Sequence, residues 1–116
     1  MSYHIDSYRF GEVVINGVRY SRDVIVFWHK VKPNWWRIEG HALYLDDVQE
    51  VFEEKPDVLV IGTGAYGIMK VKPEVEQCAK SKGVELIKAP TDEACRIYNK
   101  LINEGKRAVA ALHLTC

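Results

Sequence analysis

The sequence predicts a three-layer α/β domain with a mixed, largely parallel central sheet and an additional N-terminal β-hairpin layer. An uninterrupted apolar run at 58–61 leads into a glycine-rich turn at 62–67. Such a run is typical of a parallel strand that is buried on both faces. From residue 45 onward, helical and extended patterns alternate, which implies parallel crossovers. An Asn16-Gly17 pair between two short apolar runs predicts the hairpin.

The N-terminal part is expected to be mostly β-structure. Strands at 13–15 and 18–20 flank the Asn-Gly turn, whose residues both tolerate the positive φ that a type I′ turn requires. A third strand is expected at 24–28, in the interior of a sheet, because apolar residues fall on both of its faces. Residues 1–12 and most of 29–41 are expected to be irregular.

Three helices are expected between the later strands. The first spans 45–52, where apolar residues share one face and two aspartates occupy the first turn. The second begins at Pro73, which suits the first helical position, and ends at Gly83. The third runs from an N-cap at Thr91 to Gly105. Further strands are expected at 84–87 and 107–114, and 68–72 is compatible with a short extended segment.

Composition limits the classes of function. A chain of 116 residues has room for one core, so we expect a single domain over 1–116. Sixteen Lys and Arg balance sixteen Asp and Glu, and this zero net charge argues against a nucleic-acid partner. No apolar run approaches the ~20 residues of a membrane span, and the N-terminus has no signal-peptide pattern. Three widely spaced cysteines fit a reducing compartment, so we expect a cytoplasmic protein.

The glycine turn is the first candidate site, because ligands of open α/β sheets usually lie outside the carboxyl ends of strands. Its candidate ligand-binding residues are Gly62, Thr63, Gly64, Tyr66 and Gly67. The spacing matches Gly-x-Gly-x-x-Gly, but a dinucleotide fingerprint needs a helix that opens at the turn and an acidic residue about 20 positions later. Both are missing, since the next helix begins near Pro73. A small anion held by backbone N–H groups and a purely structural tight turn remain as alternatives.

An aromatic and basic segment is the second candidate site. Its candidate partner-binding residues are Trp28, Trp35, Trp36, Arg37 and His41. Tryptophan and arginine in an exposed loop are enriched at the anchor points of protein interfaces. Stacking on single-stranded bases is less compatible with the zero net charge. Ordinary packing of the loop over the core is the remaining alternative.

No catalytic or metal site is predicted from the remaining polar residues. No two histidines have helical ligand spacing, and Cys78 and Cys95 lie on apolar helix faces, where cysteine usually behaves as a small hydrophobic residue. The acidic pairs at 46–47 and 53–54 have the pattern of solvated surface charge. No nucleophile, base and orienting group can be assembled, which argues modestly against an enzyme. No cofactor is expected.

Several segments in order carry a resemblance to a known family: 5–11, 15–17, 36–41, 60–64 and 110–116. Together they resemble a family of small domains of unknown function that includes the adipogenesis-associated domain protein and a mitochondrial complex I assembly factor. The resemblance implies a compact three-layer α/β domain without an established catalytic activity, whose described members act through other proteins. It places Gly62, Thr63 and Gly64 on the family's glycine turn, and Trp36, Arg37, Gly40 and His41 on its aromatic-arginine segment.

Two hypotheses for the function follow. The first is a non-catalytic interaction, assembly or regulatory module that contacts a protein partner through the loop at 28–41, with the hairpin edge as a further possible contact. The second is a small-molecule or anion-binding protein, or an enzyme, with its site at the Gly62–Gly67 turn. The sequence predicts no oligomeric state.

Overall fold

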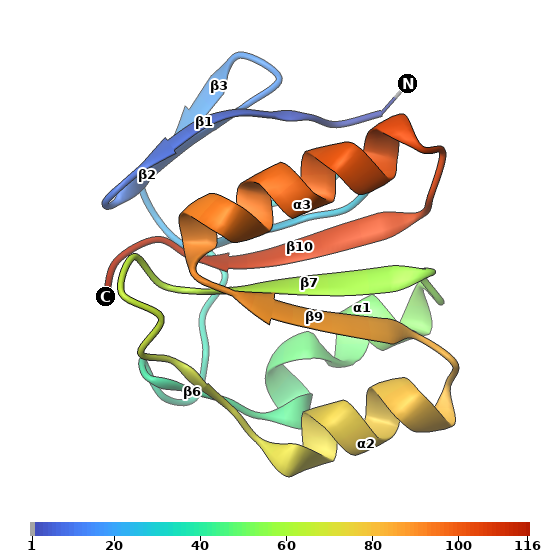
Figure 1. Ribbon diagram of the computed structural model, residues 1–116. Coiled ribbons are helices and arrows are strands. Elements are labelled where there is room, and N and C mark those ends of the chain that lie inside the picture. Colours follow the sequence, from blue (N-terminus) through green and yellow to red (C-terminus); the bar gives the residue numbers. More distant parts are fainter. Residues whose placement is uncertain (1) are drawn as a thin grey trace.

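A five-stranded mixed sheet forms the centre of the protein, as the computed structural model of residues 2–116 shows (Figure 1). Its strands lie in the order β5 (Val31–Lys32), β4 (Val24–Val26), β10 (Ala108–His113), β7 (Val58–Thr63) and β9 (Glu85–Ala89). β10, β7 and β9 are parallel, whereas β4 and β5 extend the sheet in antiparallel fashion. The predicted mixed sheet is therefore confirmed.

Helices cover both faces of this sheet (Figure 1). α2 (Pro73–Ser81) connects β7 to β9 on one face, which it shares with the 3₁₀ helix η1 (Leu45–Val48) and α1 (Gln49–Glu53). α3 (Thr91–Asn103) connects β9 to β10 across the opposite face. The three predicted helices are present, although the first begins as a 3₁₀ turn. None of the helices within residues 2–116 combines the length and the apolar character that crossing a bilayer requires.

A separate three-stranded antiparallel sheet lies beside α3 and forms the additional N-terminal layer (Figure 1). It contains β1 (Ile5–Arg9), β2 (Glu12–Ile15) and β3 (Val18–Tyr20). The predicted hairpin is β2–β3, and both of its turn residues have positive φ, +47° at Asn16 and +80° at Gly17. The expectation that residues 1–12 are irregular is wrong, because β1 pairs along β2.

The central strand β7 separates two hydrophobic cores. Val58 and Val60 pack toward α3 and the N-terminal sheet, whereas Leu59 and Ile61 pack toward α1 and α2. Every residue of β7 is buried. The apolar run is uninterrupted because each face of β7 is covered by its own layer, as the sequence predicts.

Two shorter segments differ from the expectation or refine it. The strand at 24–28 ends at Val26, because the Phe27 N–H group donates to the Lys30 carbonyl (2.8 Å) and the chain turns back as β5. The ambiguous segment 68–72 contains β8 (Lys70–Val71), which pairs in parallel with β6 (Ala42–Leu43). The segment 29–41 therefore contains β5, and its remaining loop at 33–41 leads into β6.

Thr91 has a different role from the predicted N-cap. Pro90 occupies the N-cap position, and Thr91 is the first residue of α3. Its buried hydroxyl donates to the His113 carbonyl (2.6 Å) and accepts from the Gly64 N–H group (2.9 Å). One side chain thus connects the start of α3 to the ends of both β7 and β10.

Replacing Thr91 by valine keeps the shape of the side chain and removes both hydrogen bonds. We expect Thr91→Val to lower the free energy of unfolding by about 2–4 kcal/mol, because the buried Gly64 N–H and His113 C=O groups lose their partner. Thr91→Ser keeps the hydroxyl and is the control. Urea denaturation measures both variants, and an equal loss in the two would show that the hydroxyl is unimportant.

Candidate functional site

The loops after β7 and β10 meet the start of β4 at one edge of the central sheet, which we call the carboxyl edge. Because β4 is antiparallel to β10, the residues that precede β4 lie beside the last residues of the chain. This edge lies near the label C in Figure 1. It contains the segments 21–23, 34–41, 62–68 and 114–116. It therefore brings together most of the residues of both predicted sites.

The glycine turn packs directly against the end of the chain. Gly64 has a φ of +104°, and a Cβ atom there would lie 2.6 Å from the Cys116 carbonyl oxygen and 2.8 Å from that of Thr115. A Cβ atom on Gly62 would lie 2.9 Å from Thr91 Oγ1. Close packing thus accounts for both glycines, and the positive φ is a further reason for Gly64.

The polar groups of the turn are largely engaged within the protein. The N–H groups of Gly64, Ala65 and Gly67 donate to Thr91 Oγ1 (2.9 Å), Thr115 O (2.7 Å) and Gly64 O (3.2 Å), respectively. The Thr63 hydroxyl donates to the Ala89 carbonyl (3.1 Å). A backbone anion site needs N–H groups that point at the anion, so these three N–H groups do not form one in this conformation.

Tyr66 is the one member of the turn that projects far into solvent. Tyr66 is 72% exposed, and its ring lies 6.1 Å from that of Phe10. An open groove of about 460 Å³ runs between the turn and the end of β9, with Lys70 and Lys88 in its lining. Ligand binding by Gly62, Thr63, Gly64, Tyr66 and Gly67 stays a prediction.

A buried polar cluster lies next to the turn and holds the carboxyl edge together. The Arg37 guanidinium donates through Nη1 to Asp23 Oδ2 (2.6 Å) and through Nη2 to the Gly40 carbonyl (3.1 Å). His113 Nδ1 lies 2.8 Å from the same Asp23 oxygen. The Leu114 N–H group donates to Asp23 Oδ1 (2.8 Å). Asp23 thus joins the start of β4, the loop at 34–41 and the end of β10.

Burial and hydrogen bonding act in opposite directions on Asp23. Burial raises the pKa of its carboxyl group, but the hydrogen bonds from His113, the Leu114 N–H group and Arg37 outweigh it, and the pKa falls below its usual value. The side chains of Arg37 and His113 are only 5% and 8% exposed. Breaking such a buried pair from one side costs more than the pair itself contributes, because the remaining charge stays buried.

Trp35 lies under this cluster and is not at the surface. Only 3% of the residue is exposed, its indole N–H donates to the Asp47 carbonyl (2.9 Å), and the Arg37 guanidinium lies 4.8 Å from its ring centre. The Asp47 carboxylate accepts from the N–H groups of Ile38 (3.1 Å) and Tyr44 (2.8 Å). The expectations of an exposed Trp35 and a solvated Asp47 are both wrong, since each fixes the loop from inside.

The other residues of the aromatic and basic segment divide between two edges of the sheet. Trp28 is half-buried at the opposite edge, where the guanidinium of Arg107 lies 5.8 Å from its ring. Trp36 is 76% exposed at the carboxyl edge. His41 is also exposed there, with Nε2 4.0 Å from Cys116 Sγ. The structure therefore brings Trp36, Arg37 and His41 together and separates them from Trp28.

Five large exposed apolar side chains lie on loops at this end of the sheet, and the ring of Phe10 lies 6.1 Å from that of Tyr66. We call the whole group the carboxyl-edge surface, and it consists of Phe10, Trp36, Ile38, Tyr66 and Ile68. Each of these residues is between 44% and 76% exposed. They come from three separate loops, so no local pattern could have grouped them. The sequence pointed to two of the five, Tyr66 as a member of the glycine turn and Trp36 as a member of the aromatic and basic segment.

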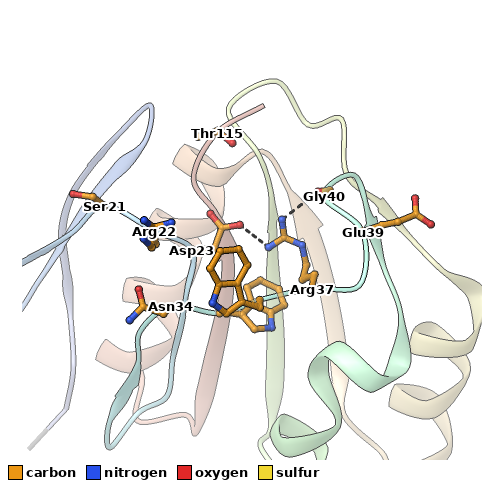
Figure 2. A pocket seen from close by; sticks show the side chains of 10 residues that line it. Ser21, Arg22, Asp23, Asn34, Arg37, Glu39, Gly40 and Thr115 are labelled. Carbon is orange, nitrogen blue, oxygen red and sulfur yellow. Dashed lines mark hydrogen bonds and ion pairs between the residues drawn. The ribbon is translucent and has the colours of Figure 1, made fainter.

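A cavity of about 340 Å³ adjoins this surface (Figure 2). The segment 21–23 forms one wall, and the loop at 34–40 forms the other. Figure 2 shows Asp23 and Arg37 joined across its inner end, with Arg22 and Asn34 on one side and Glu39 on the other. The cavity therefore combines charged groups with the exposed indole of Trp36.

The cluster does not form a recognisable catalytic or metal site. His113 Nε2 is buried without a hydrogen-bond partner within residues 2–116, so no hydroxyl or thiol there is paired with it as a nucleophile would be. The same part of the chain contains no group of three or more His, Cys, Asp and Glu side chains arranged to hold a metal ion. What the geometry does show is a polar cluster that positions a loop.

Fold and site together define a small α/β domain whose sheet edge carries a polar cluster and an exposed apolar surface. The chain belongs to the family described as protein of unknown function (DUF498/DUF598), whose model matches residues 5–113. The family resemblance carried by the sequence is thus confirmed.

Named relatives and solved structures agree with this placement. The human protein NADH dehydrogenase [ubiquinone] 1 alpha subcomplex assembly factor 3 is 29% identical over 94% of this chain, and its mouse counterpart is 27% identical. This chain covers 59% of the length of each. The hypothetical protein PH1505 from Pyrococcus horikoshii OT3 is 28% identical, with a TM-score of 0.81 over 97% of this chain and 98% of that one. A structure titled MT938 is 26% identical, with a TM-score of 0.81 over 99% and 100%.

The two glycines with positive φ in the turn allow backbone strain to be separated from close packing. Gly67→Ala has space for its Cβ and should lower the free energy of unfolding by only about 1–2 kcal/mol. Gly64→Ala also meets the Cys116 carbonyl, so we expect a loss of about 3 kcal/mol or more. Urea denaturation measures both, and equal losses would contradict close packing at Gly64.

The lowered pKa of Asp23 gives stability a defined dependence on pH. The folded state binds the Asp23 proton less tightly than the unfolded state does, so the carboxylate's contribution is fully present above the unfolded pKa of about 3.9. It is lost as the pH falls through the lower folded value. We therefore expect Asp23→Asn to be less stable than the wild type at pH 7, and to lose less further stability in acid.

Urea midpoints between pH 7 and pH 2 measure this difference. Asp6→Asn is the matched control for general acid effects, because Asp6 is exposed and accepts a hydrogen bond from a single backbone N–H group, that of Gly17. Parallel pH profiles for the wild type and Asp23→Asn would contradict the role of the buried carboxylate.

Proposed function

We propose that this protein is a non-catalytic interaction module that binds a protein partner through the carboxyl-edge surface and supports its assembly. The observation that carries the proposal is the gathering of exposed aromatic and aliphatic side chains at one edge. Scattered exposed apolar residues are normal on a soluble protein, whereas a group of them indicates an interface. Trp and Tyr are also the residue types that are enriched where binding energy concentrates.

The distribution of exposed apolar residues supports this edge over others. Six large apolar residues are clearly exposed within residues 2–116, and five of them form the carboxyl-edge surface. The sixth, Val18, lies beside the β2–β3 turn. That turn lies near His4, whose side chain contacts Asn103 at the far end of α3, so Val18 is at the opposite edge. Val18 therefore supplies an internal control.

The buried cluster supports the proposal because it holds the surface in one shape. Arg37 is fixed by Asp23 and Gly40, and Trp35 by Asp47, so the exposed Trp36 has an anchored residue on each side. The Ile38 N–H group is itself bound to Asp47. A surface that is ordered before binding loses less conformational entropy on association.

The names of the relatives agree with a role in assembly. The human and mouse relatives carry the name of an assembly factor of NADH dehydrogenase, and they are longer proteins than this chain. We transfer from them only the general role of acting on other proteins. We also infer a cytoplasmic location, on the basis of the sequence alone.

The second candidate function is a small ligand at the 62–67 turn. The groove of about 460 Å³ with Lys70 and Lys88 in its lining favours it. Against it stand the internal hydrogen bonds of the turn, which engage the N–H groups of Gly64, Ala65 and Gly67. Lys88 is also paired with Glu76 (3.2 Å). The interaction surface therefore has the stronger support.

Site-specific photo-crosslinking tests the surface directly. Benzoylphenylalanine at position 38 should capture a discrete protein from extract of the native organism, because Ile38 is 67% exposed within the surface. The same probe at position 18, where Val18 is 53% exposed, should capture at least about tenfold less. Adding Trp36→Ala to the position-38 protein should remove most of the captured product.

The thermal midpoint of each labelled protein is the control for folding. Since Trp36, Ile38 and Val18 are exposed, we expect all of the proteins to remain folded. Equal capture from positions 18 and 38, or capture that is unchanged by Trp36→Ala, would contradict the proposed surface.

A further inference from the structure

The cavity beside Trp36 has an unpaired positive charge in its lining. Arg22 forms no ion pair with any carboxylate of residues 2–116. Its guanidinium lies 5.9 Å from the Trp36 ring centre, so the cation and the exposed indole stand together at the cavity. A guanidinium stacked on an aromatic ring still presents its N–H groups along its edge.

The same cavity has two negative charges, of which Asp23 is ion-paired and Glu39 is not. Asp23 accepts from Arg37, His113 and the Leu114 N–H group. The Glu39 carboxylate accepts from the Tyr44 hydroxyl (2.7 Å). Arg22 is therefore the cation without an ion-pair partner at this cavity, and Figure 2 shows Glu39 on the side away from it.

This arrangement is complementary to a carboxylate that is attached to an apolar group. Arg binds a carboxylate through two parallel N–H···O bonds, and the hydroxyl of Ser21 and the amide of Asn34 add further polar groups to the wall. A phosphate, with up to two negative charges, fits less well, since Arg22 is the only unpaired cation in the lining and Glu39 lies nearby. An apolar neighbour of the carboxylate would contact Trp36, which lines the cavity and is 76% exposed.

We propose that this cavity receives the carboxylate of an Asp or Glu side chain in a partner protein, with an adjacent aromatic or aliphatic side chain on Trp36. This inference rests on the proposed function and specifies the chemistry of its partner. The volume of about 340 Å³ accommodates one or two side chains rather than a folded element. Arg22 selects the acidic residue, and the carboxyl-edge surface binds the apolar one.

A pair of short peptides tests the charge requirement. The probes are N-acetylated and C-amidated Gly-Leu-Glu-Phe-Gly and the same peptide with Gln in place of Glu, titrated into ¹⁵N-labelled protein. We expect the Glu peptide to shift the Trp36 indole and Gly40 signals and to bind about tenfold more tightly than the Gln peptide, which corresponds to about 1.4 kcal/mol. The Val18 signal should not move.

Two charge-removing variants locate the effect. Arg22→Gln should make the Glu and Gln peptides bind equally. Lys82→Gln is the matched control, because Lys82 lines a cavity of similar size, about 330 Å³, that also contains Arg107 from the opposite edge of the sheet. The preference for the Glu peptide should survive in Lys82→Gln. In the wild type it should weaken in 0.5 M NaCl, because salt screens an exposed ion pair.

Three results would overturn the inference: equal binding of the two peptides to the wild type, a preference for Glu that persists in Arg22→Gln, or no binding by either peptide. Free 3-phenylpropionate that binds as tightly as the Glu peptide would also overturn it, because the occupant would then be a small carboxylate. The proposed function is tested apart from these results, by capture at position 38 in the Arg22→Gln background. If the wild type shows no preference for the Glu peptide and position 38 still captures a protein, the acidic partner is rejected and the interaction surface is kept.

Discussion

The carboxylate of Asp23 is the interaction on which the rest of the carboxyl edge depends. It binds the Leu114 N–H group after β10, the His113 ring and the Arg37 guanidinium, and it belongs to the residue that precedes β4. One side chain therefore joins two neighbouring strands of the sheet to a loop that has no regular backbone pairing of its own. The arrangement needs all three donors, since a buried carboxylate is stable only when its lone pairs are satisfied.

The Thr91 hydroxyl makes a second connection a short distance away. It joins the start of α3 to Gly64 and His113, so His113 takes part in both networks, by its ring and by its carbonyl group. The glycine turn is consequently a packed junction, in which the N–H groups of Gly64, Ala65 and Gly67 donate within the protein. Packing thus accounts for glycines in a turn that has the Gly-x-Gly-x-x-Gly spacing but lacks the helix that a dinucleotide fingerprint requires.

Much of the fold could be predicted from local patterns, because β7, the Asn-Gly hairpin and the three helices each carry their signal within a few residues. The site could not be predicted in the same way. The contact of Asp23 with His113 spans 90 positions, and Trp35 looks like an exposed loop residue until its indole N–H is seen to reach Asp47. Sequence patterns report the period of burial along an element, whereas these residues are buried by partners that lie outside their own segment.

The contrast between Arg22 and Arg37 shows how such a network separates structure from recognition. Both line the same cavity, but the side chain of Arg37 is only 5% exposed and is bound to Asp23 and Gly40. Arg22 has no carboxylate partner within the described residues. Asp23 accepts from Arg37, His113 and the Leu114 N–H group, and it forms no ion pair with Arg22. The carboxylate that orders the loop is thus paired with Arg37, and Arg22 stays beside Trp36 without a carboxylate partner. The specificity proposed for the surface rests on this difference between the two arginines.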